Sequence, residues 1–138
     1  MIQIYQDDLL RALKRCKGIA KQDLLPNNFI PQSDFRRAHA EARRETYTKL
    51  IDLVESEGIQ AACVFAFSTY QSLPVFSPGE TVDSAVQGHA QALEMFFNVI
   101  GIAGEQVQAL HNGNSDFSQL LAYTPEFTEE ISSQSLVN

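Results

Sequence analysis

The chain has 138 residues, of which 44% are hydrophobic and 20% are charged. This is the composition of a folded protein with a core rather than of a disordered chain, and the length is that of one domain, residues 1–138. No stretch approaches the roughly 18 apolar residues that a membrane-spanning helix needs, so we expect no membrane partner.

The charge is divided unevenly along the chain. The net charge is −7, yet all 10 Lys and Arg residues lie at or before Lys49. Residues 1–50 carry these 10 basic residues against 6 acidic ones, a net charge of +4, whereas residues 51–138 carry 11 acidic residues and no basic one, a net charge of −11. Such an asymmetry between halves points to partners or to self-association.

The two cysteines, Cys16 and Cys63, could form one disulfide at most. The first residues, MIQIYQDDLL, lack the basic and apolar segments of a secretory signal. We therefore expect reduced thiols and a cytoplasmic protein.

Apolar periodicity, capping residues and glycines predict a series of helices. The predicted ranges are 7–17, 34–57, 59–70, 80–102, 105–111, 115–121 and 124–131. The first is expected to start at a capping Asp7 or Asp8 and to end at Gly18, and residues 132–138 are expected to be frayed.

The helix at 80–102 is the one around which we expect the rest to pack. Its apolar residues fall within a stripe about 100° wide. They are Val82, Val86, His89, Leu93, Phe96, Phe97 and Ile100. Ser77 and Pro78 are its expected start and Gly101 its expected end, and Gly88 is placed to let a neighbouring helix approach closely.

The run at 59–70 is ambiguous. Cys63, Phe65 and Phe67 alternate as in a strand, but three alanines and few β-branched residues favour a helix. The predicted fold class is therefore all-α, a single-domain bundle of four to six helices around a central apolar helix. The alternative is an α+β fold with a short buried strand at 61–69.

Four arginines fall within an arc of about 120° on the predicted helix 34–57. They are the candidate partner-binding residues Arg36, Arg37, Arg43 and Arg44. They could contact carboxylates of another protein or phosphates, or they could pair with the acidic second half of the same fold or of a neighbouring subunit.

One side of that helix is expected to be buried. Its residues are Phe35, Ala38, Ala42, Leu50, Leu53 and Val54. Tyr47 and Val54 are expected to border the arginines, where a second subunit could cover them. Glu45 and Lys49 are i,i+4 neighbours of favourable charge order.

No catalytic or metal-binding motif is present. Cys63 lies in the most apolar run, where burial makes a thiol inert, and His39, His89 and His111 lie far apart without ligand spacing. An aromatic-lined ligand pocket could form from candidate residues in two predicted helices. These are Phe65, Phe67, His89, Phe96 and Phe97.

We therefore expect a small acidic cytoplasmic protein–protein interaction module of the adaptor, inhibitor or immunity type. We expect it to be non-enzymatic, without catalytic residues, cofactor or metal, and to form a homodimer. The alternatives are a nucleic-acid-binding protein that uses the basic helix at 34–49, and a helical small-ligand binder with the aromatic pocket. The acidic second half argues against a polyanionic partner.

Overall fold

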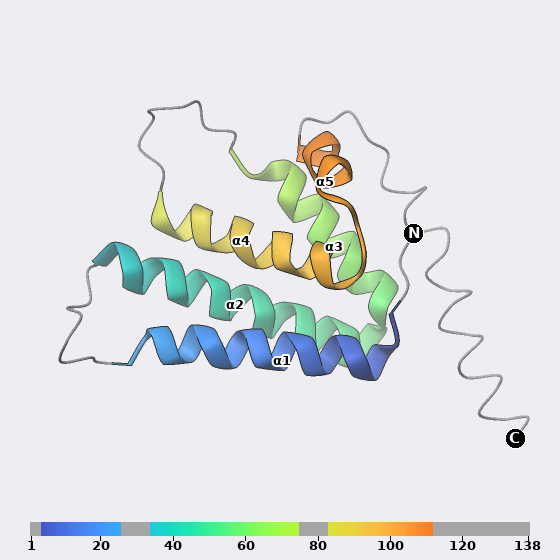
Figure 1. The fold of residues 1–138 in the computed structure, drawn as a ribbon, viewed down its shortest axis with the longest axis horizontal. Coiled ribbons are helices and arrows are strands. Elements are labelled where there is room, and N and C mark those ends of the chain that lie inside the picture. The colour runs from blue at the N-terminus through green and yellow to red at the C-terminus, as the bar shows by residue number, and fades with distance from the viewer. Residues whose placement is uncertain (1–3, 26–33, 75–82, 112–138) are drawn as a thin grey trace, which may run out of the picture.

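The computed structural model describes residues 4–25, 34–74 and 83–111, and within these ranges it contains five helices and no strand (Figure 1). They are α1 (Gln6–Asp23), α2 (Asp34–Glu57), α3 (Ile59–Ser72), α4 (Ser84–Val99) and α5 (Gly104–His111). The all-α prediction is confirmed, and the segment considered as a strand at 61–69 is helical. The predictions for 115–121, 124–131 and 132–138 lie outside the described residues.

Three helices, α1, α2 and α4, lie side by side, and α3 and α5 lie at one end of them (Figure 1). The longest helix, α2, contacts α1, α3 and α4. The apolar α4 lies in the core as predicted. Helix α2 holds α1, α3 and α4 together, because it packs against all three.

The core is aromatic. Phe67 and Tyr70 of α3 and Phe96 and Phe97 of α4 are completely or almost completely buried. Phe97 stacks on Phe67 with ring centres 5.3 Å apart and meets Tyr70 edge-on at 5.4 Å. Offset stacking and edge-to-face contacts are the favourable geometries for such rings, so α3 and α4 are fixed to each other by specific packing as well as by burial.

Helix α1 is longer than predicted. It continues through Gly18, which is exposed, to Asp23. The buried residues Leu9, Leu13 and Ala20 recur on one face on both sides of the glycine, and this burial outweighs the ~1 kcal/mol that a mid-helix glycine costs. At the other end the N-cap is Tyr5, without a side-chain cap. The prediction that an aspartate caps α1 is therefore wrong.

Helix α4 begins later than predicted, because Asp83 caps its N-terminus instead of lying within its polar face. Asp83 has an extended backbone, and its carboxylate accepts hydrogen bonds from the Ala85 and Val86 amides at 2.8 and 3.2 Å. This is the geometry of an N-cap, so the helix starts at Ser84. Ser77 and Pro78 lie outside the described residues.

The end of α4 was predicted correctly. Gly101 has a φ of 89°, a left-handed conformation that favours glycine. The amide of Ile102 donates to the Phe97 carbonyl at 2.9 Å, and that of Gly101 donates to the Asn98 carbonyl at 3.2 Å. This Schellman arrangement satisfies the last carbonyls of the helix and brings Ile102 back into the core.

Gly88 permits the close contact between α4 and α2. A β-carbon built on it would meet the backbone oxygen of His39 and would lie 2.9 Å from the Ala42 side chain. Phe35 does not join this packing. It lies in the first turn of α2, is 51% exposed and stacks on His39, so its predicted burial is wrong.

Candidate functional site

The predicted arginine cluster is divided by the fold. Arg43 is directed toward the end of α1, where its Nη2 lies 2.6 Å from Oδ2 of Asp23 and its side chain is only 13% exposed. Its partner belongs to the basic half of the chain rather than to the acidic half. Arg36 is partly buried and Arg37 is exposed. The cluster is therefore not one continuous surface.

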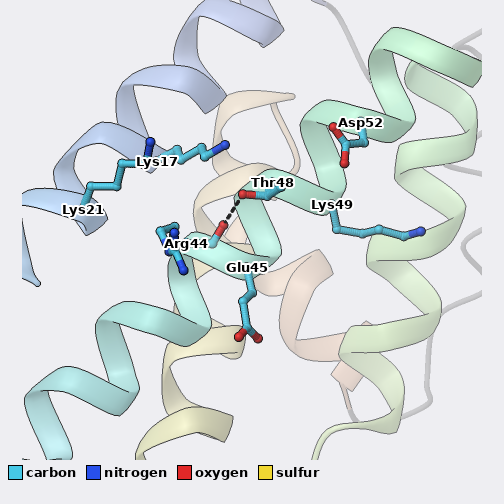
Figure 2. Close-up of a pocket in the computed structure, with 7 residues that line it drawn as sticks. All are labelled: Lys17, Lys21, Arg44, Glu45, Thr48, Lys49 and Asp52. Carbon is cyan, nitrogen blue, oxygen red and sulfur yellow. Dashed lines mark hydrogen bonds between the residues drawn. The ribbon is translucent and has the colours of Figure 1, made fainter.

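Arg44 contributes to a groove that the sequence did not reveal. This α1–α2 groove has a volume of about 420 Å³ and combines residues of two helices (Figure 2). It is lined by Lys17 and Lys21 of α1 and by Arg44, Glu45, Thr48, Lys49 and Asp52 of α2. The lining thus contains four cationic side chains and two carboxylates, an excess of two positive charges.

The local helix geometry explains this gathering of charge. Lys17 and Lys21 are four residues apart and share one face of α1. Arg44 and Thr48 have the same spacing on α2, and the Thr48 hydroxyl donates to the Arg44 carbonyl at 2.8 Å. Since α1 packs beside α2, the two faces meet along the groove. Lysines near the C-terminal end of a helix interact favourably with its dipole. Because this explains Lys17 and Lys21 by itself, the sequence alone did not indicate that they also line a groove.

Arg44 retains unused hydrogen-bonding capacity. Its Nε is buried and has no acceptor in the part of the chain that the structure describes. Buried polar atoms usually have a partner, because leaving one unpaired costs about 1–3 kcal/mol. The Nε of Arg43, which does not line the groove, is likewise buried without an acceptor among the described residues, so this feature is not particular to the groove.

The second hollow, the α2–α4 pocket, has a volume of about 260 Å³. It is lined by Glu45, Thr46, Lys49, Phe65, Thr69, Leu73 and His89. Of the predicted pocket residues, Phe65 and His89 line it. Phe67, Phe96 and Phe97 are instead fully buried in the core.

Lys49 belongs to both hollows. It extends toward α3, and its Nζ lies 5.8 Å from the centre of the Phe65 ring (Figure 2). Glu45 points elsewhere, and no ion pair joins it to Lys49 within the described ranges, so the pair expected from their spacing does not form. A cation beside an aromatic face gains about 0.5–1 kcal/mol at an exposed site. This gain favours the contact of Lys49 with Phe65 over an ion pair with Glu45.

His89 is hydrogen-bonded to α2 through Thr46. The Thr46 hydroxyl lies 2.9 Å from the Ala42 carbonyl oxygen and 2.7 Å from Nδ1 of His89. A hydroxyl can both donate and accept, so either tautomer of the imidazole can form the bond that joins α4 to α2 here.

Cys63 is fully buried, and burial raises the pKa of its thiol to about 12. It is therefore an inert thiol at neutral pH, as its apolar setting predicted. Both Cys16 and Cys63 are free. Within the described residues, no three His, Cys, Asp or Glu side chains lie together as a metal site would require, and no helix there is long and apolar enough to cross a membrane.

Comparison of the chain with protein-family models, with curated proteins and with solved structures gives no significant match.

Proposed function

We propose that this protein is a small, non-enzymatic interaction module whose α1–α2 groove binds an acidic segment of another protein, as an adaptor, inhibitor or immunity-type partner would. The observation that carries the proposal is the meeting of Lys17, Lys21, Arg44 and Lys49 around one groove.

The carboxylates in the groove favour a protein partner over a nucleic acid. Glu45 and Asp52 lie among the four cations. A phosphate backbone is a uniform row of negative charges and would be repelled at these two positions, whereas an acidic peptide can space its carboxylates to avoid them. Residues 51–138 add a net charge of −11, which opposes a polyanion more strongly than a short peptide.

We further propose that the protein acts in the cytoplasm and forms a homodimer. The division of charge along the chain supports self-association, because the basic part of one copy could meet the acidic part of another. Tyr47 and Val54 do not contribute to this argument. Both are buried within the subunit and leave no apolar border for a second copy to cover.

Fluorescence anisotropy with a labelled glutamate-rich peptide tests the groove. We expect the wild type to bind it, with affinity falling as salt rises. The double variant Lys21→Glu/Arg44→Glu should bind about tenfold more weakly or not at all, since each tenfold loss corresponds to about 1.4 kcal/mol.

The control is Arg11→Glu, which reverses one charge of α1 at an exposed position outside the groove. It should bind the peptide nearly as well as the wild type. Equal binding by all three proteins, or tighter binding of double-stranded DNA than of the peptide, would contradict the proposal.

A further inference from the structure

The two hollows lie on either side of the same stretch of α2 and share two of its residues, Glu45 and Lys49. In Figure 2, Lys17, Lys21 and Arg44 lie at the α1 side of this stretch, while Lys49 extends from it toward α3. Because Lys49 lines both hollows, it connects the basic groove with the second hollow across α2.

The α2–α4 pocket has the size and lining of a site for one side chain. Its volume, about 260 Å³, lies below the range of roughly 300–1,000 Å³ that is usual for sites enclosing a whole small molecule. Phe65 and Leu73 supply apolar surface, and the Lys49 ammonium lies beside the Phe65 ring. An aromatic side chain suits such a site, because it can pack on Phe65 and present its face to the cation.

We propose that the partner segment is bipartite, with an aromatic anchor in the α2–α4 pocket and acidic residues in the α1–α2 groove. This inference rests on the proposed function, and it adds the sequence class of the partner. The anchor supplies apolar burial, and the carboxylates meet Lys17, Lys21 and Arg44.

The width of α2 sets the spacing between the two parts. A helix with its side chains is about 10–12 Å across, and an extended chain advances about 3.3–3.6 Å per residue. The anchor and the first groove-bound carboxylate are therefore about three residues apart. The ammonium of Lys49, between the two hollows, is placed to contact a carboxylate or backbone carbonyl of the connecting residues.

The test uses three short labelled peptides of equal length. The first carries phenylalanine about three residues from a run of glutamates, the second has alanine in place of phenylalanine, and the third has phenylalanine directly adjacent to the glutamates. Anisotropy titrations measure the affinity of each for the full chain.

Two protein variants locate the anchor. Thr69→Phe fills the α2–α4 pocket from its own lining, and Ser68→Phe adds the same side chain at the neighbouring exposed position outside the pocket. We expect the wild type and Ser68→Phe to bind the first peptide about tenfold more tightly than the other two, since burying one aromatic side chain provides at least that gain. Thr69→Phe should bind the first two peptides equally.

The failures are distinguishable. If the wild type binds the first two peptides equally, the anchor inference is overturned while the groove proposal stands. If the wild type binds none of the three, the groove proposal falls and the anchor inference falls with it. An unchanged preference of Thr69→Phe for the first peptide would also overturn the anchor, because that side chain would then lie elsewhere.

Discussion

Gly88 and Gly18 both lie inside helices, but they should respond oppositely to the same substitution. At Gly88 a β-carbon would collide with the His39 backbone oxygen and crowd Ala42, and neither is a flexible side-chain end. Gly88→Ala should therefore lower the free energy of unfolding by about 1–3 kcal/mol, despite the better helix propensity of alanine. At Gly18 nothing lies within 4 Å of the added carbon. Gly18→Ala should raise the free energy by about 0.5–1 kcal/mol.

Urea unfolding of the two variants measures this difference directly. If Gly88→Ala were as stable as the wild type, the close approach of α2 and α4 at this residue would be contradicted. If Gly18→Ala were destabilised, the continuous course of α1 through residue 18 would be contradicted.

His39 should make stability depend on pH. Burial, with a smaller contribution from Arg43, lowers the pKa of this imidazole from its ordinary value of 6.5. Below pH 6.5 the unfolded chain therefore takes up a proton more readily than the folded chain, so stability falls as the pH falls from 6.5 through the lowered pKa. His39→Gln should remove this part of the acid sensitivity.

Urea unfolding of the wild type and His39→Gln at about pH 7.5 and about pH 5.5 compares the two slopes. The wild type should lose more stability over this interval. Equal losses would show that His39 titrates alike in the folded and unfolded chains.

At the scale of the elements, the packing of α4 should contribute much of the stability through the buried ring of Phe96. Phe96 is fully buried, and its neighbour Met95 is 39% exposed. Phe96→Ala should therefore cost about 3–5 kcal/mol, the usual loss for a large buried side chain, while Met95→Ala should cost under about 1 kcal/mol. Thermal or urea unfolding checks both, and a Phe96→Ala variant as stable as the wild type would mean that the apolar stripe of α4 is an interface instead.

Most helices could be predicted because local patterns decide them. The alanine-rich run at 59–70 is helical, α2 ends at Gly58 as expected, and Gly101 ends α4. The end of α1 and the start of α4 were predicted wrongly, because each was assigned from a residue whose type fits two structural roles. Gly18 can end a helix but is tolerated when Ala20 is buried beyond it, and Asp83 can lie on a polar face or act as a cap.

The candidate site could be predicted only in part, because it depends on contacts between helices. Arg44 was found from its helix, but its association with Lys17 and Lys21 requires the packing of α1 on α2. The same packing removes Arg43 from the surface by pairing it with Asp23. In α4, His89 lines a pocket, whereas Phe96 and Phe97 of the same stripe are directed into the core.

At the scale of the whole molecule, the ion pair that the described residues form between the two halves does not account for the division of charge. Lys14 and Glu55 join the two halves at 3.5 Å, but both side chains are about half exposed, and such pairs contribute about 0–1 kcal/mol. This gain is too small to explain why residues 51–138 contain no Lys or Arg. The division of charge is therefore consistent with the proposal that it serves contact with a second copy or with a foreign partner.

Sedimentation at moderate and high salt tests the homodimer. Because Arg43 is engaged with Asp23, the informative variant is Lys21→Glu/Arg44→Glu, whose side chains line the groove. We expect a dimer for the wild type at moderate salt, and a shift toward monomer at high salt and in the variant. A monomer in all four measurements would rule out the dimer and leave the groove to a foreign acidic partner.

The most direct test of the groove is a titration of the isotope-labelled protein with the glutamate-rich peptide, followed by the chemical shifts of its backbone amides. We predict progressive shifts at Lys17, Lys21, Arg44 and Thr48, which together line the α1–α2 groove, and small or no shifts on the exposed face of α3. Shifts absent from these four residues, or confined to other parts of the molecule, would contradict the proposal that the groove binds acidic partners.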